Sequence, residues 1–173
     1  ARHMAEARPL HAIGQDILFA ARSELYLNLP YLDAALCALR FAPGDNVTAS
    51  LATDGETLYY SGAYLADRYL RSRTLTNRAY LHVILHCMLR HLAKKRGRVP
   101  ALWDLACDAA VESILDGLDY PCLQQNGSPK RQKFYGECLR GMPVLTAEGI
   151  YRRLLRLRLS EYERAQLETC FFV

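Results

Sequence analysis

The chain has 173 residues, of which 51% are hydrophobic and 23% charged, and its formal net charge is +4. This length and composition predict one domain with a sizeable core. No uninterrupted apolar run approaches the roughly 20 residues of a bilayer-spanning helix, and no charged segment followed by an apolar one marks a secretion signal. We therefore expect a cytoplasmic protein without a membrane partner.

Hydrophobic spacing and turn residues predict the elements in chain order. Residues 1–3 precede Met4 and have the character of a tag remnant, so residues 4–173 are interpreted as a single domain. Helices are expected at residues 6–21, 30–39, 64–71, 77–95, 102–115 and 148–159, and a capping box at residues 160–163 opens another. Residues 119–143 are expected to form a long segment that is partly irregular. The predicted fold class is mainly α with a small β-hairpin (α+β).

The hairpin is predicted from residues 47–53 and 57–60, which have extended character on either side of the turn signal Asp54-Gly55. Two interpretations stay open. The hairpin either covers one end of a helical core, or forms a cleft rim that holds a substrate backbone by adding it as a further strand. In the second case Tyr59 is a candidate cleft residue.

The strongest functional signal is a pair of histidines, His82 and His86, in the middle of the helix expected at residues 77–95. Residues four apart lie on one face of a helix, so this helix offers two imidazole nitrogens to one metal ion. In the motif H-E-x-x-H a glutamate follows the first histidine and acts as the general base of a metallopeptidase. Here that position holds Val83. The alternative is a buried polar network in which histidines and carboxylates satisfy one another.

Two further residues of this helix are candidates for the surroundings of the site. Arg90 lies four residues after His86 and is expected to pair with a carboxylate if it faces the site. His91 lies nine residues after His82, about 180° around a regular helix, so we interpret it as a cap or as a group in contact with a ligand.

The helix at residues 102–115 carries three acids, Asp104, Asp108 and Glu112, on one stripe. Asp108 and Glu112 are both candidate donors of a third metal ligand, and Asp108 is the favoured one. Asp104 is a candidate neighbour of the site. Glu112 is the only nearby carboxylate that could replace the missing glutamate as catalytic base. The alternative interpretation is that these three acids form a solvent-exposed face of the helix and no site.

Other ligand classes are less consistent with the sequence. The six cysteines are scattered and none forms C-x-x-C, which favours buried free thiols, although Cys87 and Cys107 adjoin candidate ligands. Basic runs occur at residues 94–98, 130–133 and 152–158. The first lies at a helix end and the third alternates with leucine, so a solvated face explains these two runs. No fold signature of nucleic-acid binding accompanies the charge, so nucleic-acid binding is not expected.

Three segments together resemble a known family. They are T-D-G-E-T-L-Y-Y (residues 53–60), Y-L-H-V-I-L-H-C-M-L-R-H (residues 80–91) and W-D-L-A-C-D-A-A-V-E (residues 103–112). Over about residues 10–160 the chain is similar to the putative metallopeptidase domain at the N-terminus of bacterial VWA-like proteins. The resemblance implies a zincin-like helical core around the H-x-x-x-H helix. It also implies a chain truncated before a VWA-like domain, which would be a partner within the full-length protein.

The resemblance further implies zinc as the cofactor, held by His82, His86 and Asp108, with Val83 as the departure from the family pattern. Three functions stay open. The first is a degenerate metallopeptidase-like domain, a pseudoenzyme that binds a metal and a peptide or protein partner with weak or no hydrolysis. The second is an active zinc peptidase that uses Glu112 as a substitute base. The third is a non-catalytic helical scaffold with an internal network of histidines and carboxylates.

Overall fold

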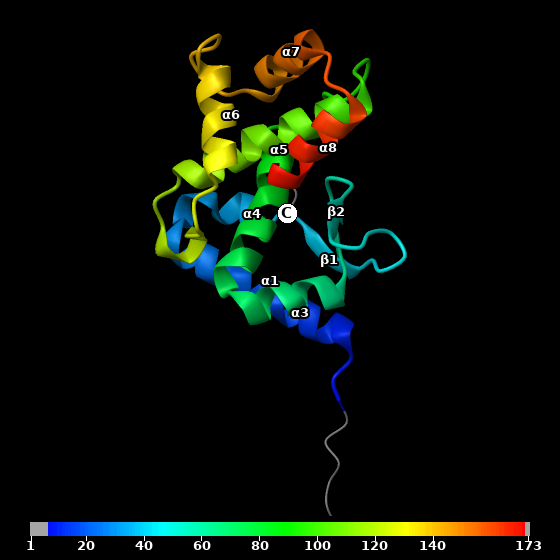
Figure 1. Cartoon of the computed structure of the whole chain (residues 1–173). Helices are drawn as coiled ribbons and strands as arrows, with labels where there is room; N and C mark the ends of the chain where they lie inside the picture. The colour runs from blue at the N-terminus through cyan, green and yellow to red at the C-terminus, as the bar shows by residue number, and fades with distance from the viewer. Residues whose placement is uncertain (1–6, 172–173) are drawn as a thin grey trace, which may run out of the picture. The chain divides into compact units, whose positions relative to one another are not determined.

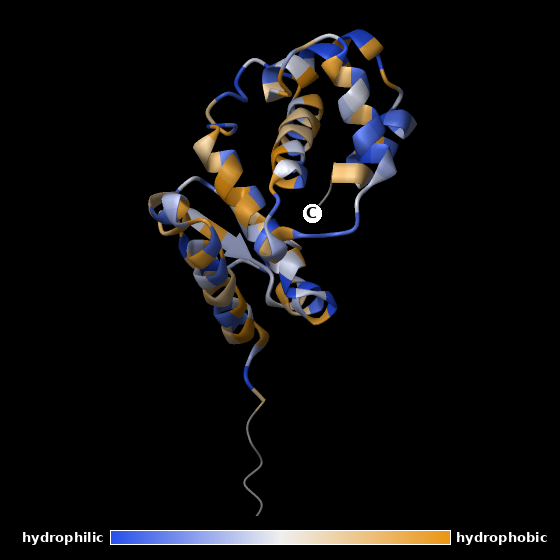
Figure 2. Ribbon diagram, turned by 90° about the vertical axis from the view of Figure 1, so that its left-hand side faces the viewer, coloured by the Kyte–Doolittle hydropathy of each residue, from blue (hydrophilic) through white to orange (hydrophobic). Residues whose placement is uncertain are grey.

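The computed structural model describes residues 7–171 (Figure 1). The described chain divides into two compact units, with the boundary between Ile84 and Leu85. The predicted tag remnant at residues 1–3 lies outside the described residues. The fold is mainly α-helical with one small sheet, which confirms the predicted fold class. Hydrophobic and hydrophilic residues alternate along most of the helices, as expected where one face of a helix is buried (Figure 2).

The first unit contains the sheet and the first helices. Its elements are α1 (Leu10–Asn28), the 3-10 turn η1 (Pro30–Leu32), α2 (Asp33–Leu36), β1 (Arg40–Pro43), β2 (Leu51–Thr53), β3 (Thr57–Tyr60), α3 (Gly62–Arg71) and α4 (Arg73–Met88). Helix α4 is continuous across the boundary between the units.

The sheet contains the predicted hairpin and one strand that was not expected. Strands β2 and β3 are antiparallel and the turn at Asp54-Gly55 joins them, as predicted, with Gly55 at a φ of 96°. The first strand of the hairpin is shorter than predicted, because it begins at Leu51 and not at residue 47. Strand β1 pairs in parallel with the other edge of β3, so the strand order is β1-β3-β2. The helix expected at residues 30–39 therefore ends early, at Leu36, and the chain becomes extended at Arg40.

In the rest of the first unit, helices α1 and α3 pack closely against each other. Gly62 lies against the backbone of Leu10, and Gly14 lies against the ring of Tyr60. The Tyr60 hydroxyl donates a hydrogen bond of 2.8 Å to the carbonyl oxygen of His11. Side chains larger than hydrogen at the two glycines would separate the helices.

A half-buried arginine connects α1 to the central helix α4. Arg22 donates to the hydroxyl of Tyr80 (3.1 Å) and to the carbonyl of Leu39 (2.9 Å), and its guanidinium lies 4.2 Å from the Phe41 ring centroid. The Tyr80 hydroxyl in turn donates to the carbonyl of Leu36. These bonds satisfy polar groups inside an apolar region, as burial requires.

The second unit consists of α5 (Pro100–Gly117), the 3-10 turn η2 (Pro121–Leu123), α6 (Pro129–Leu139), α7 (Ala147–Leu157) and α8 (Glu161–Phe171). Helix α6 lies in the segment that was expected to be partly irregular. Pro129 occupies its first turn, and the Ser128 hydroxyl accepts from the N–H of Arg131 as an N-cap. The predicted capping box is confirmed: Ser160 Oγ accepts from the N–H of Glu163 (3.2 Å), whose carboxylate accepts from the N–H of Ser160 (2.9 Å).

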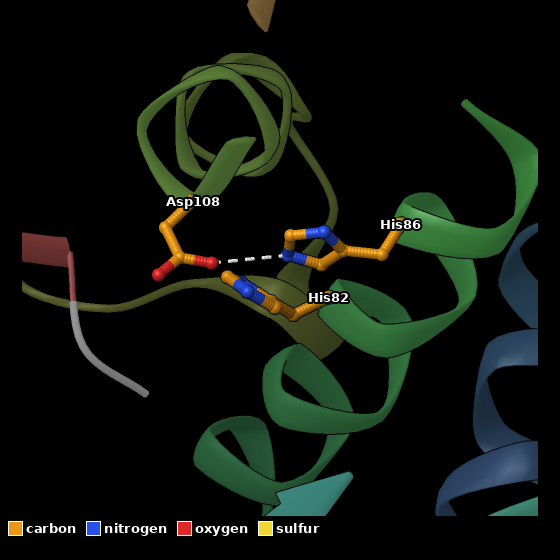
Figure 3. A group of neighbouring side chains, drawn as sticks. All are labelled: His82, His86 and Asp108. Carbon is orange, nitrogen blue, oxygen red and sulfur yellow. Dashed lines mark ion pairs between the residues drawn. The ribbon is translucent and has the colours of Figure 1, made fainter. Parts of the chain in front are cut away.

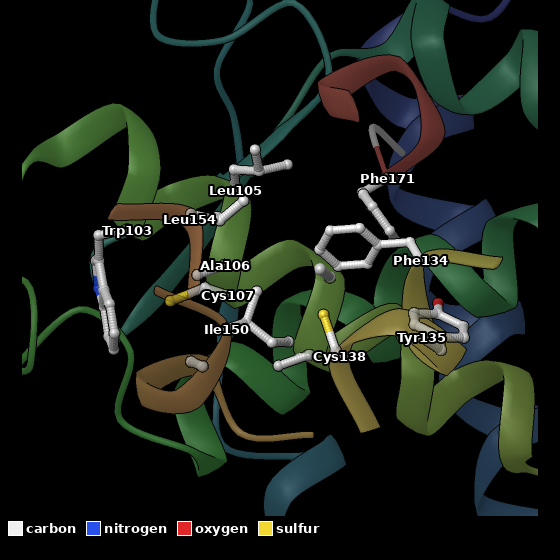
Figure 4. Close-up of a cluster of buried hydrophobic side chains, with 13 residues drawn as sticks. Trp103, Leu105, Ala106, Cys107, Phe134, Tyr135, Cys138, Ile150, Leu154 and Phe171 are labelled. Carbon is white, nitrogen blue, oxygen red and sulfur yellow. The ribbon is translucent and has the colours of Figure 1, made fainter. Parts of the chain in front are cut away.

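The core of the second unit is formed by α5 together with side chains from α6, α7 and α8 (Figure 4). Its buried members are Trp103, Leu105, Ala106, Cys107, Ala109, Ala110, Phe134, Tyr135, Cys138, Ala147, Ile150, Leu154 and Phe171. Phe134 and Phe171 meet edge to face at 5.3 Å between ring centroids, which fixes α8 against α6.

Candidate metal centre

Helix α4 is buried along its central turns, as predicted, and carries the two histidines there. Val83, Ile84 and Leu85 are each at most 8% exposed. His82 is 8% exposed, and the side chain of His86, one turn later, is 18% exposed. Two imidazoles held this way need hydrogen-bond partners or a metal ion, because an unsatisfied buried polar group is costly.

Asp108 on α5 reaches the same site. Its Oδ1 atom lies 3.1 Å from Nε2 of His86, and the three side chains point toward one another (Figure 3). One ligand atom from each of His82, His86 and Asp108 can be chosen so that all lie within 4.8 Å of one another. The structure therefore brings together the three residues that the sequence suggested as metal ligands.

The chemistry of this donor set fits a metal ion with three protein ligands. Two imidazoles and one carboxylate form a set typical of catalytic zinc, which keeps an open fourth position. Two ligands on a tetrahedral zinc ion, each bound at about 2.0 Å, are about 3.3 Å apart. The 3.1 Å separation of His86 Nε2 and Asp108 Oδ1 is already close to that value.

Helix α4 ends sooner than predicted, in a tight turn that determines where His91 lies. The N–H of Arg90 bonds to the carbonyl of Cys87 and the N–H of His91 to that of His86, both at 3.1 Å. This is the Schellman arrangement, in which the residue after the C-cap is left-handed. That residue is Arg90, with a φ of 58°. The chain reverses here, so the regular-helix argument for His91 does not apply.

This reversal of the chain brings the His91 ring into contact with the His86 ring. Their Nδ1 atoms are 3.1 Å apart, and the rings meet edge to face at 5.0 Å between centroids. Nε1 of Trp103 donates to the carbonyl of His91 at 3.1 Å. Burial, together with the nearby His86 and Lys94, lowers the pKa of His91 to about 4, so its ring is neutral at pH 7.

The other predicted neighbours of the site have contacts of their own. The side chain of Arg90 is exposed. Asp104 forms an ion pair with Lys95 at 2.8 Å, with both side chains largely exposed. Tyr59 donates from its hydroxyl to Asp54 at 3.0 Å, which stabilises the hairpin turn.

Glu112, the candidate substitute base, is 2% exposed, and its Oε2 atom lies 3.7 Å from Nη1 of Arg131. Arg131 also binds both carboxylate oxygens of Asp116, at 2.8 and 2.9 Å, and Tyr135 donates to the same carboxylate at 3.0 Å. This network was not predicted, because Arg131 was considered only as a member of the basic run at residues 130–133. The helix-start signal Ser128-Pro129 could have located it on α6.

The thiols take no part in the three-residue cluster. Among the free cysteines, Cys87 is partly buried and Cys107 is buried. Burial raises the pKa of the Cys107 thiol well above its ordinary value, aided by the neighbouring Asp108. A metal ligand must be a thiolate, so burial disfavours Cys107 as a donor.

A comparison with known protein families matches a region of the chain that contains the three-residue cluster. The model of one family, described as a putative metallopeptidase domain, matches residues 15–167, which include all three residues of the cluster. No curated protein and no solved structure matches the chain. Within residues 7–171, no helix has both the length and the apolar character that crossing a membrane requires.

Proposed function

Because the chain belongs to the putative metallopeptidase domain family, we propose that it is a metal-binding domain that binds a peptide or protein with weak or no hydrolysis. The proposed ligands are His82, His86 and Asp108, and the proposed metal is zinc. The observation that carries this proposal is the convergence of these three side chains, whose ligand atoms lie within 4.8 Å of one another. Zinc bound there would act as a Lewis acid that polarises a carbonyl oxygen.

Val83 is the reason for placing binding ahead of hydrolysis. In H-E-x-x-H the corresponding glutamate accepts a proton during peptide cleavage. A valine side chain accepts no proton, and Val83 is 8% exposed. Loss of a general base typically costs about 10²–10⁴ in rate. We therefore propose that a bound peptide is released unchanged or cleaved slowly.

The alternative is an active peptidase in which Glu112 replaces the missing base. Glu112 lies four residues after Asp108 on the same helix, which favours this role. Its burial and its ion pair with Arg131 favour a structural role instead. We rank this alternative second.

The partner that we propose is a peptide segment of another protein, recognised together with a VWA-like domain of the same full-length chain. The support is the paired motif of residues 80–91 and 103–112, on which the resemblance to VWA-like proteins rests. The site itself would contact the peptide through the open position of the metal.

Metal content is the first test. Protein purified without a nickel column is analysed for metals at neutral pH, and about one zinc per chain is expected. His82→Ala should abolish bound zinc, whereas His11→Ala, at an exposed histidine of α1, should leave it unchanged. Circular dichroism of each variant checks folding. Absence of metal in the wild type would refute the proposal and favour the internal network of the scaffold hypothesis.

Cleavage of casein or of a peptide library, with and without a chelator, separates binding from hydrolysis. The wild type should show little or no chelator-sensitive cleavage, and Val83→Glu should raise it. Fast chelator-sensitive cleavage by the wild type, lost in Glu112→Gln, would instead establish the peptidase alternative. If neither protein cleaves, the binding function stands.

A further inference from the structure

The contact between His86 and His91 constrains where the protons of both rings lie. The two Nδ1 atoms are 3.1 Å apart, so one of them must donate and the other accept. A neutral imidazole carries one proton, on either Nδ1 or Nε2. The position of the proton on one ring therefore determines its position on the other.

Without a metal, the carboxylate of Asp108 settles the direction of this hydrogen bond. An ionised carboxylate only accepts, so the 3.1 Å contact to Asp108 Oδ1 requires a proton on Nε2 of His86. In a neutral His86 ring, Nδ1 then carries a lone pair, and His91 donates to it from its own Nδ1.

With a metal, the direction must reverse. A metal ion takes the lone pair of His86 Nε2, so the proton of that ring lies on Nδ1 and His91 must accept it. We propose that His91 is the positioning residue of the metal centre: a neutral ring that donates to His86 in the metal-free state and accepts from it in the loaded state. A backbone carbonyl, which only accepts, could serve the loaded state alone. This inference rests on the proposed metal site.

The change conserves protons on the two rings. On loading, the Nε2 proton of His86 leaves to solvent, the Nδ1 proton of His91 moves to Nδ1 of His86, and Nε2 of His91 takes a proton from solvent. Each ring therefore carries one proton before and after the change.

The fold holds His91 in place for this role. The left-handed Arg90 reverses the chain immediately before it, and Trp103 bonds to its carbonyl and packs edge to face at 6.0 Å between ring centroids. His91 is 5% exposed, so few waters compete for its Nδ1. Fixing a ligand imidazole through its second nitrogen typically changes metal affinity by about 10–100-fold.

Nitrogen-15 NMR of the histidine rings tests the reversal directly. In the metal-free wild type, His86 should be protonated on Nε2 and His91 on Nδ1. Addition of one equivalent of zinc should move the proton of His86 to Nδ1 and that of His91 to Nε2. Retention of a proton on Nδ1 of His91 in the loaded protein would overturn the proposal.

Zinc affinity, measured by competition with a chromophoric chelator, gives a second readout. His91→Ala should weaken binding about 10–100-fold. His91→Asn, whose amide both donates and accepts, should recover part of the loss, and Leu92→Ala, at a half-exposed neighbour, should change little. Equal affinity of His91→Ala and wild type, with intact circular dichroism, would overturn the positioning role alone. Failure of the wild type to bind zinc would overturn the proposed function and this inference together.

Discussion

Replacement of Arg131 by methionine should destabilise the second unit strongly. Methionine keeps much of the length of the side chain but removes the charge that holds Asp116 and Glu112. The side chains of Arg131, Asp116 and Glu112 are 11%, 12% and 2% exposed, so each of the two buried carboxylates would lose an ion pair. Breaking a buried ion pair in this way costs about 3–5 kcal/mol. For a chain of this size that lowers the melting temperature by about 6–20 °C.

The distances also predict how the free-energy cost of losing Arg131 is divided between Asp116 and Glu112. Arg131 binds Asp116 through two hydrogen bonds of 2.8 and 2.9 Å but approaches Glu112 only to 3.7 Å. In double-mutant cycles with Asp116→Asn and Glu112→Gln, the coupling energy to Asp116 should be about 2–3 kcal/mol and that to Glu112 about 1 kcal/mol.

Urea unfolding, followed by the fluorescence of Trp103 in the second unit, measures these energies. Trp103 is the single tryptophan of the sequence, so the signal reports this unit. Lys133→Met, at an exposed position of the same helix, is the matched control and should change stability by less than about 0.5 kcal/mol. A cost of less than about 1 kcal/mol for Arg131→Met, or a stronger coupling of Arg131 to Glu112 than to Asp116, would contradict this prediction.

Other predictions concern the helix end, the helix contact and pH. Arg90→Gly should raise the free energy of unfolding by up to about 1 kcal/mol, because glycine adopts a φ of 58° without strain; a lower melting temperature would contradict this. Gly62→Ala should cost about 1–3 kcal/mol in urea unfolding, since its Cβ would overlap the carbonyl of Leu10; wild-type stability would show that α3 shifts freely. A hydrogen bond from Lys94 holds the pKa of Glu148 below its usual value, so this pair contributes stability above the unfolded pKa of about 4.3, and the contribution is lost as pH falls through the lower folded value. Lys94→Met should make the free energy of unfolding depend less on pH in this range. The change should be less than about 1 kcal/mol, because the two side chains are partly exposed. An unchanged pH dependence would show that Lys94 does not lower the pKa of Glu148.

The three candidate ligands could be identified from the sequence because the signal for them is local. His82 and His86 are one helical turn apart wherever that helix packs, and Asp108 lies on the next strongly patterned helix. The hairpin was likewise predicted from the local turn signal Asp54-Gly55. The histidine pair and the hairpin each depend on a few neighbouring residues, whose preferences agree with the final fold, whereas the choice of Asp108 also used the resemblance of three segments to a known family.

The features that were missed depend on contacts distant in sequence or on unusual backbone. Strand β1 has four residues and gains its partner, β3, from a segment about 17 positions later, which no short periodicity reveals. The end of α4 depends on a left-handed arginine, where the sequence offers no glycine as a signal. Helix α6 was obscured by the glycines around it, although its N-cap serine and first-turn proline were readable.

The distribution of the thiols determines how the metal experiments can be run. Cys37 is exposed, whereas Cys87 and Cys170 are partly buried and the remaining three cysteines are buried. A maleimide dye would therefore react first at Cys37, in the first unit, and would complement the fluorescence of Trp103 in the second. The same surface thiol needs a reductant during storage, and a phosphine suits zinc titrations better than a dithiol, which would itself bind the metal.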